Sequence, residues 1–146
     1  MKIRAFLLSD LNQVAVLLDE YRMFYKKDSD VEACKQFIEE RYNNKESIIF
    51  LAEENEKVFG FVQLYPVFST VSLQRAYILN DLFVRSINRS SGAGKKLIEK
   101  SFDFAKENNA RYVCLETGVD NVNAQGLYEK MGMSVDNEVL HYSRVL

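Results

Sequence analysis

The sequence predicts an α/β domain, in which strands and helices alternate along a chain of 146 residues. The clearest strand is Tyr77–Val84, an apolar run rich in β-branched and aromatic residues. The clearest helix is Lys95–Ala105, where Leu97, Ile98, Phe102 and Ala105 recur along one helical face. A short glycine-containing stretch, Arg89–Gly94, joins them and creates a strand–loop–helix unit.

The first half of the chain predicts one strand followed by two helices. Lys2–Phe6 is a short strand, and Ser9 is the expected cap of the first helix. The second helix is expected over Val31–Asn43. Apolar residues expected to face the core from these two helices are Leu11, Val14, Leu17, Leu18, Tyr21, Tyr25, Phe37, Ile38 and Tyr42.

The middle of the chain predicts a hairpin, with strands Ser47–Glu53 and Val58–Tyr65 joined by the polar turn Glu54–Lys57. Pro66–Gln74 is expected to be an irregular connection before the strand that ends at Val84. The elements expected after the strand–loop–helix unit are a helix end at Asn108–Asn109, a fifth strand Tyr112–Thr117, a helix Asn123–Lys130 closed by Gly132, and a last strand Glu138–Val145.

The composition narrows the class of protein. With 47% hydrophobic and 27% charged residues, it is typical of a soluble globular protein, and the length predicts one domain over residues 1–146. A net charge of −2 carries no electrostatic signature of a nucleic-acid partner. No secretory signal or membrane span is recognisable, so a cytoplasmic protein is expected. There Cys34 and Cys114 are expected to be reduced and buried, and His141 has no neighbours typical of a metal site.

The loop Arg89–Gly94 indicates a phosphate or pyrophosphate site. A helix that begins after a glycine loop presents unpaired N–H groups and the positive end of its dipole. A Walker A loop does not fit, because Arg89 stands at the first glycine position and Lys96 at the Ser/Thr position. The dinucleotide-binding fingerprint fits Gly92 and Gly94 but has Leu97 at its third glycine, so that alternative is weakened and stays open.

A third loop family fits better. Arg89-Ser-Ser-Gly-Ala-Gly94 resembles the [RQ]-x-x-G-x-[GA] loop of the GCN5-related N-acetyltransferases, the GNAT superfamily. Upstream, Asp81-Leu-Phe-Val84 resembles the family's fourth strand, and downstream Glu116–Met133 resembles its E-x-x-x-x-N-x-x-A-x-x-L-Y-x-x-x-G-[FM] ending. The resemblance implies a mixed central sheet of six to seven strands, helices on both faces, and splayed fourth and fifth strands.

The resemblance also implies a co-substrate, acetyl-CoA, and no metal. The pantetheine arm is expected along Leu82, Phe83 and Val84, with a backbone N–H near Phe83 as oxyanion donor. Tyr128 is expected to protonate the leaving thiolate, and Asn121 either to bond the pantetheine or to cap its helix in competition with Asn123. The pyrophosphate is expected to contact Arg89, Ser90, Ser91, Gly92, Ala93, Gly94 and Lys95.

The acceptor side is less determined. The general base is expected to be Glu116 or Asp81, unless a water chain replaces it. Tyr21-Arg-Met-Phe-Tyr25 resembles a segment of bacterial Hpa2-type acetyltransferases, so Tyr21, Arg22, Tyr25 and Asp81 are candidate acceptor contacts. Acids on the first helices, among them Asp19 and Glu20, are expected either to attract a cationic amine or to be solvated.

Several acceptors and one other function remain open at this stage. The acceptor is a polyamine-like amine, an amino sugar, or a lysine or N-terminal amine. The alternative function is a non-catalytic acyl-CoA sensor. The apolar edge from Val135 to Leu146 is a candidate homodimer surface.

Overall fold

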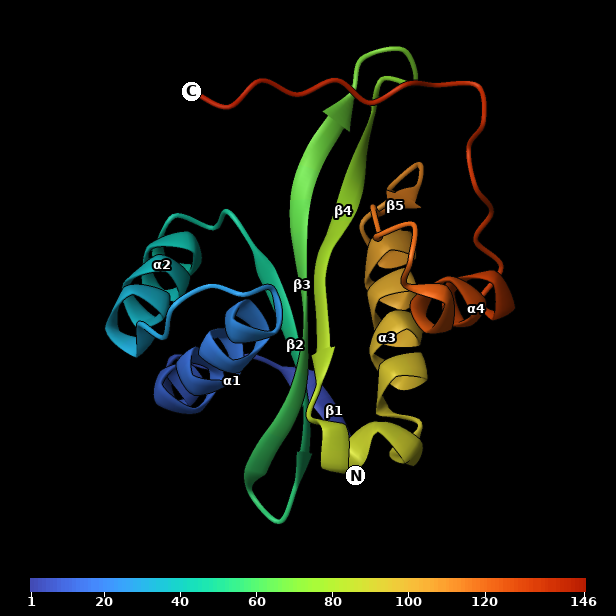
Figure 1. Cartoon of the computed structure of the whole chain (residues 1–146). Helices are drawn as coiled ribbons and strands as arrows, with labels where there is room; N and C mark the ends of the chain where they lie inside the picture. The colour runs from blue at the N-terminus through green and yellow to red at the C-terminus, as the bar shows by residue number, and fades with distance from the viewer. The chain divides into compact units, whose positions relative to one another are not determined.

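Five strands form one mixed sheet with the order β1-β2-β3-β4-β5 (Figure 1). This computed structural model describes residues 1–146. The first four strands pair antiparallel in sequence order, and β5 joins β4 in parallel. The strands are β1 (Lys2–Ala5), β2 (Ile48–Glu54), β3 (Lys57–Ser69), β4 (Gln74–Val84) and β5 (Val113–Cys114).

Four α-helices accompany the sheet. They are α1 (Leu11–Phe24), α2 (Val31–Asn43), α3 (Ala93–Glu107) and α4 (Val122–Lys130), and 3₁₀ turns η1 (Leu8–Asp10) and η2 (Ser86–Ser91) precede α1 and α3. The chain consists of two compact units, Met1–Glu116 and Thr117–Leu146. The sheet with α1, α2 and α3 makes up the first unit, and α4 belongs to the second. No helix is long and apolar enough to cross a membrane.

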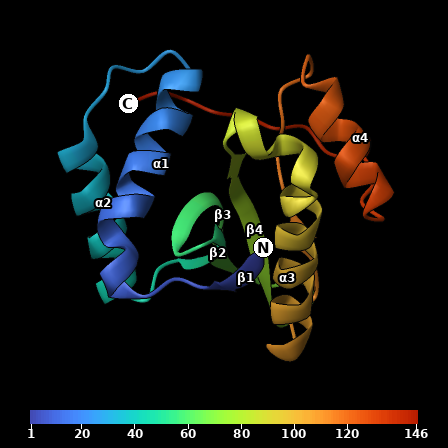
Figure 2. The same ribbon diagram turned by 90° about the horizontal axis from the view of Figure 1, so that it is seen from below.

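Within the first unit, α1 and α2 cover one face of the sheet and α3 covers the other (Figure 2). Aromatic side chains join each layer to the sheet. On the α1 face, the rings of Tyr21 and Phe61 lie 6.1 Å apart, and on the α3 face those of Phe50 and Phe104 lie 5.5 Å apart. Apolar burial of this kind is the main driving force for folding. The predicted α/β class, with helices on both faces, is confirmed.

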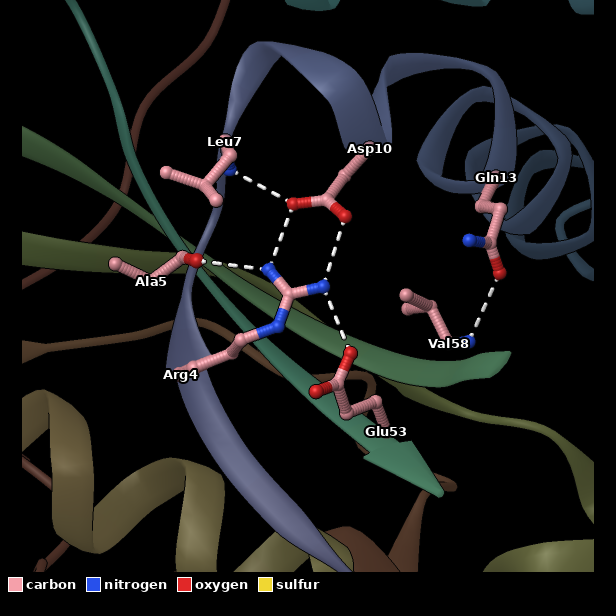
Figure 3. Close-up of polar contacts among 7 residues, drawn as sticks. All are labelled: Arg4, Ala5, Leu7, Asp10, Gln13, Glu53 and Val58. Carbon is pink, nitrogen blue, oxygen red and sulfur yellow. Dashed lines mark hydrogen bonds and ion pairs between the residues drawn. The ribbon is translucent and has the colours of Figure 1, made fainter. Parts of the chain in front are cut away.

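A partly buried ion-pair cluster fixes the start of α1 against the sheet (Figure 3). Arg4 on β1 donates two hydrogen bonds to the carboxylate of Asp10, at 2.7 and 2.8 Å, and a third to Glu53 on β2 at 2.7 Å. The Asp10 carboxylate also accepts the Leu7 amide at 2.8 Å. The pKa of Asp10 is held below its ordinary value, first by the Arg4 hydrogen bonds and then by that amide.

The structure corrects several sequence predictions about a helix cap and about the burial of side chains. Ser9 lies inside the 3₁₀ turn η1, and α1 begins after Asp10 with no side-chain cap. Tyr25, at the C-terminal end of α1, is exposed. Phe37 and Tyr42 are exposed because Ile38 and Cys34 supply the buried face of α2. Both cysteines are free thiols, but only Cys34 is buried. The exposure of Cys114 contradicts the expectation that both cysteines are buried.

Pro66 continues the strand rather than ending it. It pairs with Tyr77, so the predicted irregular connection Pro66–Gln74 is largely strand. β2 begins at Ile48, opposite Leu64, so it does not extend beside Pro66, which has a neighbouring strand on one side only. There its missing N–H is tolerated.

The C-terminal part of the sheet is smaller than predicted. β5 keeps two residues of the expected Tyr112–Thr117, and Glu138–Val145 forms no strand. The sheet therefore has five strands instead of six to seven. His141 consequently lies outside any strand. Alternating apolar residues make a strand only where a partner strand supplies hydrogen bonds, and no such pairing forms over 138–145.

Candidate active site

One edge of β4 is open along its C-terminal half. β5 pairs with β4 only at Tyr77 and Ile78, so Leu79–Val84 has β3 on one side and no strand on the other. The Arg85 amide donates to Phe59 on β3 at 2.9 Å. Because amides alternate along a strand, Phe83 also faces β3, whereas Leu82 and Val84 face the open edge. This edge can pair with an extended, amide-containing ligand.

The chain after β4 forms a loop that ends in a helix N-terminus. Gly92 has φ +80°, a left-handed conformation that glycine adopts without strain, and α3 begins at the next residue. The Ala93 amide donates to the Ser91 hydroxyl at 3.3 Å. The amides of Gly94 and Lys95 are first-turn donors without a partner inside the helix, so they and the helix dipole fit a diphosphate.

Two cations flank this loop. The Arg89 Nε donates to the Val84 carbonyl at 3.2 Å, which ties the loop back to the open edge. The Lys95 ammonium lies 3.7 Å from Glu99 in the next helical turn. Both side chains are solvent-accessible, and Ser90 lies between them in the exposed loop. A cleft of about 510 Å³ adjoins the loop and is lined by Glu20, Phe24, Phe83, Arg85, Ser86, Ile87 and Arg89.

A buried polar cluster lies on the α1 side of β3 and β4. The Asp81 carboxylate accepts hydrogen bonds from two side-chain amides, from Gln63 Nε2 at 2.7 Å and from Asn80 Nδ2 at 3.1 Å. Gln63 also donates to the Tyr65 hydroxyl at 3.0 Å. Burial raises the pKa of Tyr65 to about 12, assisted by the Asp81 charge, and the pKa of Tyr21 is raised for the same two reasons. Both phenols are therefore protonated at neutral pH.

The acceptor contacts expected from sequence separate in the structure. Tyr21 is near enough to Asp81 for its phenol to interact with the carboxylate, and the Tyr25 ring lies 5.1 Å from the Tyr21 ring. Arg22 instead turns to the α1–α2 loop, where it donates to the Asp28 carbonyl at 3.5 Å. Gln63 and Tyr65 were missed, although polar residues two apart in an apolar strand were the available signal.

The acids of α1 serve the protein's own structure. Asp19 is buried and accepts from the Ser29 hydroxyl and the Asp30 amide, both at 2.7 Å. Glu20 forms a bidentate pair with Arg85, with its shortest contact at 2.8 Å. Neither carboxylate is therefore simply solvated or available to a cationic amine without rearrangement. Asp81, like Asp19, is a buried carboxylate whose hydrogen-bond partners are neutral, but it lies on the sheet and not on α1.

The remaining predicted residues lie near the end of the first unit or in the second. Glu116 is exposed and follows β5 by two residues. In the second unit, the Asn121 side chain accepts the Ala124 amide at 3.3 Å and caps α4, which decides between the two candidate asparagines. Tyr128 is a partly buried residue of α4, and Gly132 follows the helix with φ +87°.

No group of three or more His, Cys, Asp and Glu residues is placed to hold a metal ion.

Comparisons with known proteins agree with this geometry. Residues 12–133 match the Acetyltransferase (GNAT) family. "Uncharacterized N-acetyltransferase YhfO" of Bacillus subtilis (strain 168) is 44% identical over 142 residues, 97% of this chain and 95% of that protein. The crystal structure of "a probable acetyltransferase" has a TM-score of 0.94 at 37% identity and covers 100% of this chain and 98% of its own.

A more distant solved structure contains acetyl-CoA. It is a "predicted acetyltransferase with acetyl-CoA" from Clostridium acetobutylicum, with a TM-score of 0.79 at 14% identity, covering 97% of this chain and 95% of its own. At that identity the likeness shows the fold alone.

Proposed function

We propose that this chain, which belongs to the acetyltransferase (GNAT) family, transfers the acetyl group of acetyl-CoA to a primary amine by direct attack in a ternary complex. One observation carries the proposal: the open edge of β4 is followed, after the short turn η2, by the N-terminus of α3. A single segment, Leu82–Lys95, thus offers backbone donors for an extended thioester arm and, further along, for a diphosphate.

The loop residues would hold the diphosphate. The amides of Gly94 and Lys95 point along the helix axis to solvent, and Ser90, Ser91 and Gly92 form the turn before them. The buried Ala93 anchors the helix start. Arg89 and Lys95 supply positive charge.

The open edge would hold the pantetheine arm and the reacting carbonyl. The amides of Leu82 and Val84 face that edge, so one can hydrogen-bond the arm while the other stabilises the negative charge that develops on the carbonyl oxygen. Both amides flank Phe83, near which the oxyanion donor was expected, whereas the amide of Phe83 itself faces β3. Holding both reactants in one geometry reduces the entropic cost of their reaction.

Proton transfers complete the reaction. The acceptor ammonium must lose a proton before it attacks, and we assign this to Asp81 or Glu116, with a water chain as the alternative. Tyr128 then donates a proton to the departing thiolate. The sequence motif Leu127-Tyr-Glu-Lys-Met-Gly132 supports this assignment, which does not rest on a distance between Tyr128 and the first unit. Asn121 supports the same helix as its cap.

The proposal also covers the location, subgroup, acceptor and oligomeric state of the enzyme. We place the enzyme in the cytoplasm, within the bacterial Hpa2-type group, acting on a small-molecule amine or on a lysine or N-terminal amine. A homodimer is supported by exposed apolar side chains at the C-terminus, including Val135, Leu140 and Leu146. Light scattering of the full chain tests the dimer, which a monomer at micromolar concentration would exclude.

The first experiment is a melting curve with acetyl-CoA, and with NADH and ATP as controls. A ligand at a hundred times its Kd adds about 2.7 kcal/mol of stability. For a chain of this size that is a rise in Tm of roughly 5–10 °C. A rise with acetyl-CoA alone leads to an amine screen for thiol release, whereas a rise with NADH alone contradicts the proposal. Binding without thiol release would favour the acyl-CoA sensor.

A further inference from the structure

The side-chain amide of Gln63 is buried with its oxygen unpartnered. Gln63 is 2% exposed, and its Nε2 donates both hydrogens, to Asp81 and to the Tyr65 hydroxyl. Its Oε1 has no hydrogen-bond partner. The reverse orientation would turn this oxygen toward the Asp81 carboxylate, where two acceptors would repel. An unsatisfied buried acceptor costs free energy, so this site is suited to a donor that is not part of the chain.

The neighbouring Asp81 carboxylate lacks a cation. It is 9% exposed and is held by the neutral amides of Gln63 and Asn80, and no ion pair reaches it. Arg41 on α2 is the cation whose field reaches Tyr65, but its guanidinium pairs with Glu40 and Glu46. Buried charges in proteins are normally paired. The Asp81 carboxylate therefore lacks a positive partner, next to the Gln63 oxygen that lacks a hydrogen-bond donor.

We propose that Gln63 Oε1 and the Asp81 carboxylate together bind the primary ammonium of the acceptor. One –NH₃⁺ group supplies both the hydrogen-bond donor that Gln63 lacks and the charge that Asp81 lacks. A hydroxyl would bring no charge, and a quaternary ammonium would bring no N–H. The inference rests on the proposed acetyl transfer and names its acceptor subsite.

Aromatic side chains suggest which amines fit. Tyr21 packs against Phe61 and Phe83 with ring centroids 6.1 and 5.7 Å apart, and Tyr25 packs on Tyr21 at 5.1 Å. Since the Tyr21 and Tyr65 phenols stay protonated, these aromatic side chains are neutral. Neutral aromatic faces favour a cation and the methylene chain that carries it over a hydroxyl-rich sugar. The acceptor class is a primary alkylammonium, whether free or at the end of a lysine side chain.

A matched pair of cations tests the subsite. n-Butylammonium and butyltrimethylammonium carry the same charge and chain, but only the first donates N–H. Their Kd values for the CoA-bound enzyme are measured by ligand-observed NMR. We expect the wild type to prefer the primary ion and Gln63→Met to reduce that preference about ten- to hundredfold, as for a hydrogen bond to a charged group. Gln74→Met, at the exposed start of β4, is the matched control and keeps the preference.

Equal Kd values for the two cations in the wild type overturn the subsite, and this result needs no variant to fold. An unchanged preference in a folded Gln63→Met also overturns it, because a purely structural Gln63 would affect both ions alike. Asp81→Asn should weaken both cations. If it weakens neither, the carboxylate does not bind the ammonium and the proposal fails.

Thiol-release assays with acetyl-CoA separate this inference from the proposed function. Acetylation of 1,4-diaminobutane identifies a free amine as the source, and acetylation of a blocked lysine peptide identifies a side chain. Either result supports the subsite. Acetylation of amino sugars alone retains the acetyltransferase but overturns the alkylammonium class of acceptor. Absence of thiol release with every amine contradicts the proposed function, whatever the cations do.

Discussion

Gly94→Ala separates the two roles that a glycine at a helix start can have. Gly94 is the second residue of α3 and, unlike Gly92, does not have a positive φ. Alanine is favoured over glycine inside a helix by up to about 1 kcal/mol. The variant should therefore be more stable than the wild type by roughly 0.5–1 kcal/mol, which raises Tm by roughly 1–4 °C.

The same methyl group should weaken the binding of acetyl-CoA. The amide of Gly94 is one of two first-turn donors available to the diphosphate, and a Cβ beside it keeps the phosphate oxygens away. One hydrogen bond to a charged group contributes about 1.5–3 kcal/mol. Its loss should raise the KM for acetyl-CoA about ten- to hundredfold and leave kcat nearly unchanged.

The assay combines melting curves with initial rates of thiol release. Asn109→Gly is the control, since Asn109 lies just beyond the other end of α3 with φ +56° and glycine relieves that conformation. It should raise Tm without changing KM. A Gly94→Ala enzyme that is more stable and keeps the wild-type KM would refute the placement of the diphosphate at this helix start.

Three other variants probe the reaction and the fold. Tyr128→Phe should lower kcat about 10²- to 10⁴-fold with acetyl-CoA binding retained in melting curves, and full turnover would remove the phenol as proton donor. Glu116→Gln should lower kcat without changing the Kd of n-butylammonium, and an unchanged kcat would leave Asp81 or water as the base. Asp10→Asn should cost about 2–4 kcal/mol at pH 7, measured by urea unfolding. Because Arg4 lowers the pKa of folded Asp10, the wild type should lose stability as pH falls below about 4, whereas the variant should show a shallower loss.

The turn and the helix start at Arg89–Gly94 were predictable because their signals are local. A left-handed Gly92 and a helix that begins one residue later depend on neighbouring backbone angles, which the sequence around Arg89–Gly94 largely determines. The boundaries of α2 were also predicted to the residue, since Asp30 caps it through the Ala33 amide. Local capping and turn chemistry therefore account for the parts that agree.

The extent of the sheet depends on pairing between distant segments, and here prediction was weaker. Pro66 looked like a break, yet β2 stops short of it and β3 continues beside β4. The segment 138–145 looked like a strand but found no partner. In both cases the outcome depends on whether a partner strand lies beside the segment to form backbone hydrogen bonds. Residue type alone does not determine this.

The acceptor side shows the same limit in chemical terms. Gln63 and Tyr65 sit in a strand whose other residues build the core, and in sequence they are two polar interruptions of an apolar run. Their meaning depends on Asp81, which the β3–β4 register places directly opposite Gln63. That register leaves a buried amide oxygen and a buried carboxylate side by side without a cation. Our proposal for the co-substrate therefore rests on a local loop, whereas our proposal for the acceptor rests on the charges and hydrogen bonds that a pairing of strands leaves unsatisfied.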